Sequence, residues 1–353
     1  MIQSRVSVEP IPSLSGFTVE WSDENGYILS RKNVLYSTKN PSDRGSFRRF
    51  AKVPTSKVQQ TLAIPRLGQR LLRYMFYNVI RLPQQTCYFV TFRDRVGLID
   101  VDGHFKPVKG LERPSKFLRG CCAVDKSGGI YLGEYLSNDN RGEMCIYHLA
   151  PGDDRLQVTY TFAAKQVRHI HGVFYDKFEN ALWCTTGDLE SECRVMCSTD
   201  SFATVDIVGT GDETWRAVSL CFDQDNINYG MDAEFQQNKM FRIERKTGER
   251  RELGDMPGPV YYARSLDDVH LFGVTAEGCP SQTHNAASLW QVEQNGNLKQ
   301  ILLHDKDGLP NHFMPGTLHF NLGDAADSVA CYCYFNALKG VDGHSVKLTV
   351  VKK

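Results

Sequence analysis

The sequence predicts an all-β chain folded as a single β-propeller of about seven four-stranded blades. Three segments share one pattern, in which an apolar strand ends at an acid, a polar turn follows, and an aromatic-rich strand leads to a glycine and a second acid (120–135, 172–188 and 217–233). The acids that end the first strands are 51 and then 47 residues apart. A second hairpin with its own turn residues follows each segment. A four-strand repeat of this length is typical of a propeller blade.

Four other regions carry the same pattern in a more degraded form. The blades are therefore expected at about 17–60, 84–112, 119–164, 168–211, 215–256, 258–306 and 314–353. The first two are irregular, so six or eight blades stay open. One propeller then takes up residues 1–353, although length alone suggests two domains. An early strand, "VSVEPI" or "FTVEW", is expected to complete the last blade and close the ring.

One segment departs from the strand pattern and predicts an inserted helix near residues 66–82. In "RLGQRLLRYMFYNVIRL" the apolar residues recur at helical spacing. We expect this helix to lie between the first two blades with its apolar side packed on the propeller. The alternative is a helix that binds a partner.

Composition excludes several classes of function. Lys+Arg and Asp+Glu number 41 each, so no basic excess favours phosphate contacts, and we expect no nucleic-acid partner. No apolar stretch approaches the ~18 residues of a membrane span, and we expect no membrane partner. The N-terminal residues lack the pattern of a secretory signal, which favours a cytoplasmic protein unless a signal was removed.

Most of the 11 cysteines sit inside apolar strand-like runs, and the spacing typical of a zinc site is absent. We interpret them as reduced core residues, which also favours the cytoplasm.

Propeller geometry predicts where ionisable residues meet. The loop that leads into the first strand of a blade and the loop that leaves the second strand lie on one face. In "QVRHIHGVFYDKFENALWCTTGD" (166–188), Arg168, His169 and His171 lead into the first strand, and Asp188 leaves the second. We therefore expect these four residues on one rim of the central channel.

The same geometry predicts the candidate site residues. Catalytic roles are expected for His169, His171, Tyr262 and Asp188. Substrate contacts are expected from residues of the equivalent loops, namely Arg119, Glu134, Arg168, Trp215, Arg216, Asp232, Glu277 and His284.

Two other interpretations of these residues stay open. The arginines and acids could pair between blades and brace the ring, with the histidines as ordinary core residues. We expect no cofactor, and the alternative is a divalent metal at the His169/His171 pair with a third ligand from Asp188, His284 or Glu277.

Residues 197–209, "CSTDSFATVDIVG", resemble the Asp-box of BNR-repeat propellers, a Ser-x-Asp-x-Gly-x-Thr-Trp turn. Ser198, Asp200 and Thr204 match, whereas Phe202 and Val205 replace the glycine and the tryptophan. The resemblance implies a structural turn away from the active face. Sialidases carry such boxes, but their Arg-Ile-Pro motif is missing here.

The chain also resembles in architecture the seven-bladed propellers that include polysaccharide lyases, which use histidine, tyrosine and arginine around the mouth.

A mouth with mixed charges and aromatics suits an acidic poly- or oligosaccharide. In a lyase, Arg168 or Arg216 would neutralise the uronate carboxylate, His169 or His171 would remove the C5 proton, and Tyr262 would protonate the leaving oxygen. In a glycoside hydrolase, Asp188 would act with Glu134, Asp232 or Glu277. The third class is a propeller that binds a glycan or a protein without turnover. We expect the lyase.

Overall fold

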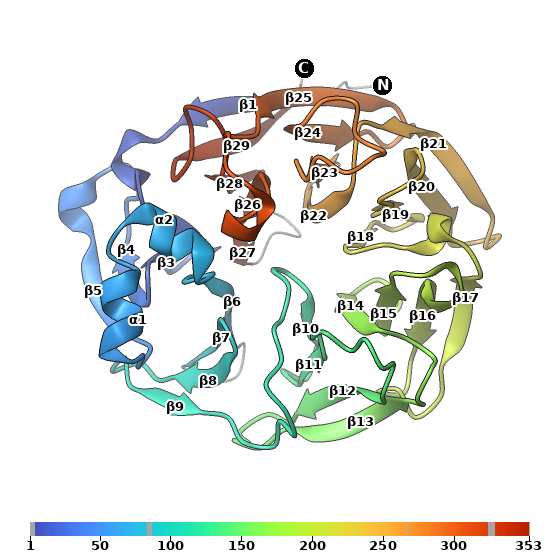
Figure 1. Ribbon diagram of the computed structural model, residues 1–353, viewed down its shortest axis with the longest axis horizontal. Coiled ribbons are helices and arrows are strands. Elements are labelled where there is room, and N and C mark those ends of the chain that lie inside the picture. Colours follow the sequence, from blue (N-terminus) through green and yellow to red (C-terminus); the bar gives the residue numbers. More distant parts are fainter. Residues whose placement is uncertain (1–3, 83–86, 268, 324–328, 353) are drawn as a thin grey trace.

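The computed structural model describes residues 4–82, 87–267, 269–323 and 329–352, which form seven sheets arranged in a ring (Figure 1). This confirms the predicted seven-bladed propeller. From the channel outward, blades 1 and 2 contain β2 (Thr18–Asp23), β3 (Gly26–Arg31), β4 (Val34–Thr38) and β5 (Arg48–Lys52), and then β6 (Phe76–Arg81), β7 (Tyr88–Phe92), β8 (Arg95–Ile99) and β9 (Phe105–Pro107). Blades 3 and 4, in the same order, contain β10 (Cys122–Val124), β11 (Ile130–Gly133), β12 (Met144–Leu149) and β13 (Gln157–Phe162), and then β14 (His169–Asp176), β15 (Ala181–Gly187), β16 (Arg194–Ser198) and β17 (Asp206–Thr210). Blades 5, 6 and 7 contain β18 (Cys221–Phe222), β19 (Asn226–Gly230), β20 (Asn238–Glu244) and β21 (Arg250–Met256); β22 (Val260–Leu266), β23 (Val269–Val274), β24 (Ala286–Val292) and β25 (Leu298–Asp305); and β26 (Thr317–Phe320), β28 (Ala330–Asn336), β29 (Ser345–Lys352) and β1 (Ser4–Pro10).

The two ends of the chain share blade 7, which closes the ring. Strand β1 pairs antiparallel with β29, from Ser4 opposite Lys352 to Pro10 opposite Val346. The closing strand is thus the "VSVEP" segment, whereas "FTVEW" begins blade 1 as β2. The short β27 (Leu322–Gly323) adds a parallel pairing between blade 7 and β2.

The acid that ends the first strand of each repeat forms the following turn. In Asp125, Asp176 and Asp223, Oδ1 accepts a hydrogen bond from the backbone N–H two residues later, at 2.8–3.0 Å. An aspartate that bonds its own backbone in this way mimics a backbone turn. The repeated acid is therefore a requirement of the hairpin.

The predicted helix near residues 66–82 is only partly helical. Helix α1 (Lys57–Leu62) precedes α2 (Arg66–Leu71), and residues 76–81 form β6, the innermost strand of blade 2. The apolar side chains of 76–81 pair with those of β7, for example Val79 with Val90. Blade 2 needs this strand, so tertiary pairing overrides the local helical spacing.

Helix α2 also faces the propeller with its charged side. Arg70 is buried and pairs with Asp307, and Arg66 pairs with Asp342. Leu67 and Leu71 are exposed. The expectation that the apolar side packs on the propeller is therefore wrong, because two ion pairs to blades 6 and 7 hold the helix instead.

The Asp-box-like turn lies between β16 and β17. Ser198 Oγ accepts from the Phe202 N–H at 2.8 Å, and Asp200 accepts from the N–H and the hydroxyl of Thr204 at 2.9 and 2.7 Å. Phe202 takes the glycine position with φ +67° and a buried ring. The turn lies at the end of the blade opposite residue 188, since β16 pairs Arg194 with Thr186 and Ser198 with Leu182. It is thus a structural turn, and membership of the Asp-box class stays a prediction.

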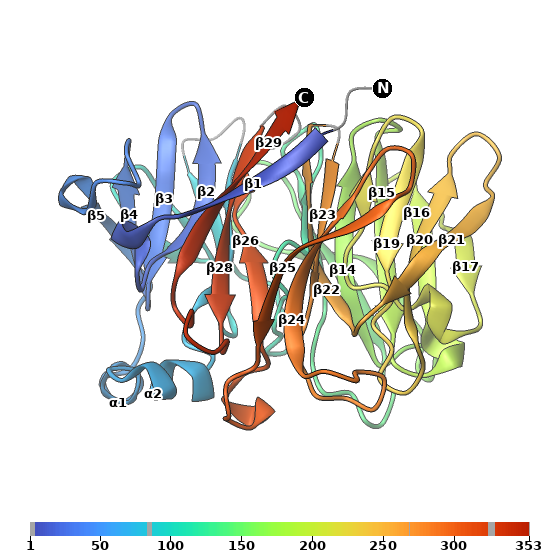
Figure 2. The ribbon, with the colours of Figure 1, turned by 90° about the horizontal axis from the view of Figure 1, so that it is seen from above.

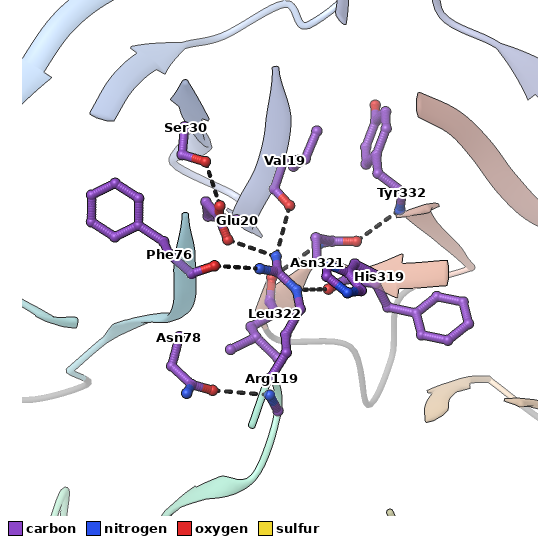
Figure 3. A network of polar contacts seen from close by, with 12 residues as sticks. Val19, Glu20, Ser30, Phe76, Asn78, Arg119, His319, Asn321, Leu322 and Tyr332 are labelled. Carbon is purple, nitrogen blue, oxygen red and sulfur yellow. Dashed lines mark hydrogen bonds and ion pairs between the residues drawn. The ribbon is translucent and has the colours of Figure 1, made fainter. Parts of the chain in front are cut away.

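Innermost segments of four blades meet in a buried polar network around Arg119 (Figure 3). Its guanidinium pairs with Glu20 at 2.6 Å and donates to the carbonyl oxygen of Phe320 at 2.8 Å. Longer contacts of 3.4 Å reach the carbonyl oxygens of Val19 and Phe76. The Glu20 and Arg119 side chains are 1% and 2% exposed, so this pair is a structural element of the ring.

No helix among the described residues is long and apolar enough to cross a membrane. Cysteines of the predicted core, such as Cys331 and Cys333 on β28, are fully buried.

Candidate active site

Asp188 is the centre of a charged cluster at one end of the channel. Its carboxylate lies 2.8 Å from Arg168 Nη1, 3.1 Å from Arg216 Nη2 and 3.3 Å from His169 Nε2. β14 pairs antiparallel with β15, with His169 opposite Gly187, so the start of one strand and the end of the other share a rim. The structure therefore brings 168–171 and 188 together. Asp188 has φ +139°, a region that a non-glycine residue rarely adopts and that is often found at functional sites.

Three nitrogen atoms around this carboxylate lack a hydrogen-bond partner among the described residues. They are Arg168 Nε, His169 Nε2 and Arg216 Nε, and all three are buried; His169 Nε2 and Arg216 Nε contact a carboxylate only at ion-pair distance, 3.3 Å from Asp188 and 3.2 Å from Asp232. Buried polar atoms in native structures are nearly always paired, and exceptions often mark a site for water, an ion or a ligand. The cluster therefore presents polar atoms that a ligand could satisfy.

Burial and neighbouring charges determine the protonation states of Asp188 and His171. Burial alone would raise the pKa of Asp188, but the close contact with His169, and then the charge of Arg216, lower it below its ordinary value. Burial and the charges of His169 and Arg216 lower the pKa of His171 to about 3. Asp188 is therefore ionised and His171 is neutral near pH 7.

The neutral His171 has a defined orientation. Its Nδ1 lies 2.9 Å from the carbonyl oxygen of Ala217. Since a carbonyl can only accept, Nδ1 carries the proton and Nε2 keeps its lone pair.

His169, His171 and Asp188 fit a divalent cation by chemistry. Each offers one ligand atom, and the three atoms lie within 4.8 Å of one another. Two imidazoles and a carboxylate are common ligands of zinc, manganese and iron. His169 Nε2 has no hydrogen-bond partner among the described residues, which leaves it able to bind a cation. The two arginines on Asp188 would compete with the cation for that carboxylate.

A second group of acids continues from the cluster along the channel wall. Arg216 also pairs with Asp232 through Nε at 3.2 Å, and Tyr261 donates its hydroxyl proton to Glu277 at 2.5 Å. Burial and the charges of Glu277 and Asp188 outweigh Arg216 and raise the pKa of Asp232 to about 8. Burial likewise raises the pKa of Glu277. The channel therefore holds an ionised acid, Asp188, beside a protonated one, Asp232.

Two adjacent cavities open at this face. The first, of about 460 Å³, is lined in part by Arg168, His169, Asp188 and Tyr135. The second, of about 290 Å³, includes Tyr261, Tyr262, Glu277 and Arg73 in its lining. Lys116 and Tyr135 line both cavities. Each volume is at or near the size of a small-ligand site, and together they could take two sugar units.

Tyr135 and Lys116 also belong to this site, although neither was among the predicted catalytic or substrate-binding residues. The Tyr135 ring lies 4.3 Å from the His169 ring, centroid to centroid. Burial raises the pKa of Tyr135 above its ordinary value, so its hydroxyl keeps its proton. The position of Tyr135 directly after Glu134, in the loop that leaves a second strand, already places it at the predicted mouth.

Three predicted substrate-binding residues are paired with other protein side chains and line neither cavity. Arg119 is held by Glu20 in the network described above. Glu134 is buried, pairs with Arg113 at 2.7 Å and accepts from the Cys145 N–H and the Tyr147 hydroxyl. His284 is exposed and pairs with Asp305 at the outer strand β25. A shared rim brings these loops to one face but does not fix the direction in which each side chain points.

Trp215 likewise lies outside the cluster. Its ring packs against Gly209 on the outer strand β17, stacks on Tyr229, and lies 3.9 Å below the Arg250 guanidinium carbon. It fills space between blades 4 and 5, so the structure gives it no contact with either cavity.

We predict that Asp232→Asn changes stability in a pH-dependent way. The raised pKa means that folded Asp232 keeps its proton up to about pH 8, whereas in the unfolded chain it ionises near its ordinary value of 3.8. Its contribution to stability is therefore full below pH 3.8 and is lost as the pH rises through about 8. Asparagine copies the protonated form at every pH.

Urea unfolding of both proteins between about pH 5 and about pH 9 measures this. The variant should gain at least about 1 kcal/mol relative to wild type over that range. A stability difference that stays constant with pH would contradict the assignment.

Comparisons with known proteins show the fold. No protein-family model matches the chain, and no curated protein matches it by sequence. Among solved structures, an oligogalacturonate lyase from Vibrio parahaemolyticus is similar, with 9% identity, a TM-score of 0.56, and coverage of 99% of this chain and 96% of that one.

A structure of oligogalacturonate lyase in complex with manganese is also similar, with 9% identity, a TM-score of 0.54, and coverage of 98% and 90%. A chain of a mitotic checkpoint complex has 12% identity, a TM-score of 0.58, and coverage of 98% and 94%. This chain therefore has a seven-bladed propeller fold that matches oligogalacturonate lyase structures among others.

Proposed function

We propose that this protein is a carbohydrate-active enzyme that cleaves an acidic oligo- or polysaccharide by β-elimination at the Asp188 cluster. The observation that carries the proposal is the set of three buried nitrogen atoms on Arg168, His169 and Arg216 that make no hydrogen bond among the described residues. They combine two cations with a candidate base beside a cavity of about 460 Å³. A fold match at 9% identity does not assign this activity, so the proposal depends on the residues.

The arginines supply the recognition of a uronate. Arg168 lines the first cavity and is about one-third exposed, whereas Arg216 is more deeply buried. A guanidinium that binds the sugar carboxylate withdraws charge and makes the adjacent C5 proton more acidic. Asp188 holds both arginines toward the cavity.

His169 is the candidate base. It lines the cavity, and its Nε2 makes no hydrogen bond among the described residues although Asp188 lies 3.3 Å away, whereas His171 is buried behind it and bonds to Ala217. In the proposed step, His169 Nε2 takes the C5 proton, the C4–O bond breaks, and a C4=C5 double bond forms. The leaving oxygen takes a proton from a tyrosine hydroxyl, so the step is balanced without water.

Two tyrosines can supply that proton. Tyr135 contacts His169 and lines both cavities, while Tyr262 lines the second cavity only. Burial raises the pKa of both, so both carry a proton at neutral pH. The ring contact of Tyr135 with His169 and its place in the lining of both cavities favour it over Tyr262.

A divalent cation is the alternative way to neutralise the sugar carboxylate. The manganese complex of the structurally similar lyase supports considering one, and His169, His171 and Asp188 have suitable ligand chemistry. Bound there, a cation would supply Lewis-acid stabilisation of the carbanion-like state. His169 cannot be its ligand and the base at once, so the two arrangements exclude each other.

A glycoside hydrolase is the second candidate, favoured by one specific observation. Arg216 bridges the ionised Asp188 and the protonated Asp232, a pair of carboxyl groups with separated pKa values. Such a pair is what acid–base hydrolysis of a glycosidic bond needs.

The experiment that tests the proposal is a screen of uronate-containing and neutral oligosaccharides for ultraviolet absorbance of unsaturated products. We expect absorbance to rise with uronates only. Treatment with EDTA should leave the activity unchanged if His169 is the base, and added MnCl2 should restore a lost activity if a cation is required. Reducing ends without absorbance would favour the hydrolase, and no product from any sugar would favour a binding protein.

A further inference from the structure

The α1–α2 hairpin contacts the propeller through charged side chains and exposes much of its apolar side. Arg70 is buried and donates to Asp307 and to the carbonyl oxygen of Phe313, while Arg66 donates to Asp342. Most aliphatic side chains of the hairpin face outward, although Ala63 and Leu72 pack against the core. Soluble surface helices normally bury the apolar side and expose the charged side, so this arrangement needs an explanation.

The outward apolar side chains form a concentrated group. Five aliphatic residues within 14 positions are 45–68% exposed, namely Val58, Leu62, Ile64, Leu67 and Leu71. Elsewhere the exposed large apolar residues of the described chain are scattered between segments. The hairpin projects from one face of the disc, beyond the ends of the strands (Figure 2). We call these five residues the apolar ridge.

The sequence around the apolar ridge is basic and contains no acid. Residues 44–93 include ten Lys or Arg and no Asp or Glu, although the whole chain is neutral. Among the described residues, Arg48, Arg49, Lys52 and Lys57 form no ion pair. Lys52 reaches α1, where its Nζ donates to Gln60 at 3.0 Å. Uncompensated positive charge from Lys52 and Lys57 therefore lies beside the apolar ridge, whereas Arg48 and Arg49 lie at the end of β5 away from α1.

We propose that the apolar ridge and its basic flank dock this protein on an anionic lipid surface. Aliphatic side chains that protrude rather than line a groove can insert among lipid chains without a shape-matched partner, and nearby Lys and Arg are attracted to acidic headgroups. The proposal needs no membrane span, so it revises only the expectation of no membrane partner.

Two other occupants fit less well. A second copy of this chain in a two-fold contact would place the acid-free segment against itself, and like charges would repel. A protein partner usually meets an aromatic-rich hot spot, whereas the apolar ridge has no aromatic residue.

Docking through the apolar ridge would bring the channel mouth toward the lipid. Arg73, just after α2, lines the second cavity, and the Phe313 carbonyl bound by Arg70 lies in the segment that leads into β26. The hairpin and the mouth therefore share a face.

Cosedimentation with vesicles tests the proposal. The full chain is mixed with vesicles of phosphatidylcholine alone, or of phosphatidylcholine and phosphatidylserine at about two to one. We expect binding to the mixed vesicles only, reduced at high salt. Leu67→Ser with Leu71→Ser should lower the partition coefficient about tenfold or more, and Lys57→Glu should lower it for mixed vesicles.

Val158→Ser with Ile207→Ser is the matched control, since both residues are exposed aliphatics on the outer strands β13 and β17. This control should bind as wild type does. Circular dichroism and the unfolding midpoint establish that every variant is folded. No binding to either vesicle, or equal binding by the Leu67/Leu71 variant, would overturn the proposal. A wild-type dimer that the same variant dissociates would assign the surface to a second copy instead.

Discussion

Replacing Arg119 with methionine is expected to lower the free energy of unfolding by about 3–5 kcal/mol. The substitution keeps most of the side-chain volume but leaves the Glu20 carboxylate charged and buried, with Ser30 as its remaining hydrogen-bond donor. It also removes the donors to the carbonyl oxygens of Phe320 and Phe76. Innermost segments of blades 1, 2, 3 and 7 lose their common contact (Figure 3). Chemical denaturation monitored by tryptophan fluorescence measures the change.

Two further variants test whether the loss of stability comes from breaking the buried Arg119–Glu20 pair. Glu20→Gln combined with Arg119→Met removes the unpaired buried charge and should recover part of the lost free energy of unfolding. Replacing both members of a buried ion pair costs less stability than removing one member, because no buried charge is left without a partner. Lys239→Met breaks an exposed pair with Glu252 and should leave stability unchanged within error. Equal stability of Arg119→Met and wild type would contradict a structural role and reopen Arg119 as a ligand-binding residue.

Replacing His169 with glutamine is expected to lower kcat about 10²–10⁴-fold on the active uronate, with a smaller change in KM. Glutamine keeps polar contacts near Asp188 but cannot take a proton from carbon at neutral pH. The arginines that bind the carboxylate remain in place. Steady-state rates of double-bond formation measure the effect.

His284→Gln is the matched control for His169. His284 is exposed and pairs with Asp305 outside both cavities, so kcat should not change. If His169→Gln keeps full activity while Asp232→Asn loses it, the acid pair carries the reaction and elimination by His169 is wrong.

The sequence predicts the fold well because a propeller repeats the same local chemistry. Each blade hairpin depends on short-range features such as the Asp176 turn, and these can be recognised without knowing distant contacts. The segment 76–81 shows the limit. Its apolar spacing fits a helix, but its partner strand β7 decides its structure.

The candidate site is predicted less completely, because a shared rim does not fix side-chain direction. Strand pairing alone places His169 beside Asp188, and the structure agrees. Glu134 leaves its blade at the equivalent position, yet it turns into the blade toward Arg113. Tyr135, one residue later, points to the cavity instead. Glu134 is held by Cys145 and Tyr147 of the next strand and by Arg113, and such contacts between segments are not encoded in a local pattern.

The origin of the atoms in the products tests the central claim most directly. The enzyme is given an oligouronate in isotopically labelled water, and the product masses are measured. The account predicts that the two products together have the mass of the substrate, that one contains a double bond, and that neither new end contains oxygen from the solvent. A gain of one water with the labelled oxygen at the new reducing end would show hydrolysis and contradict elimination at the Asp188 cluster.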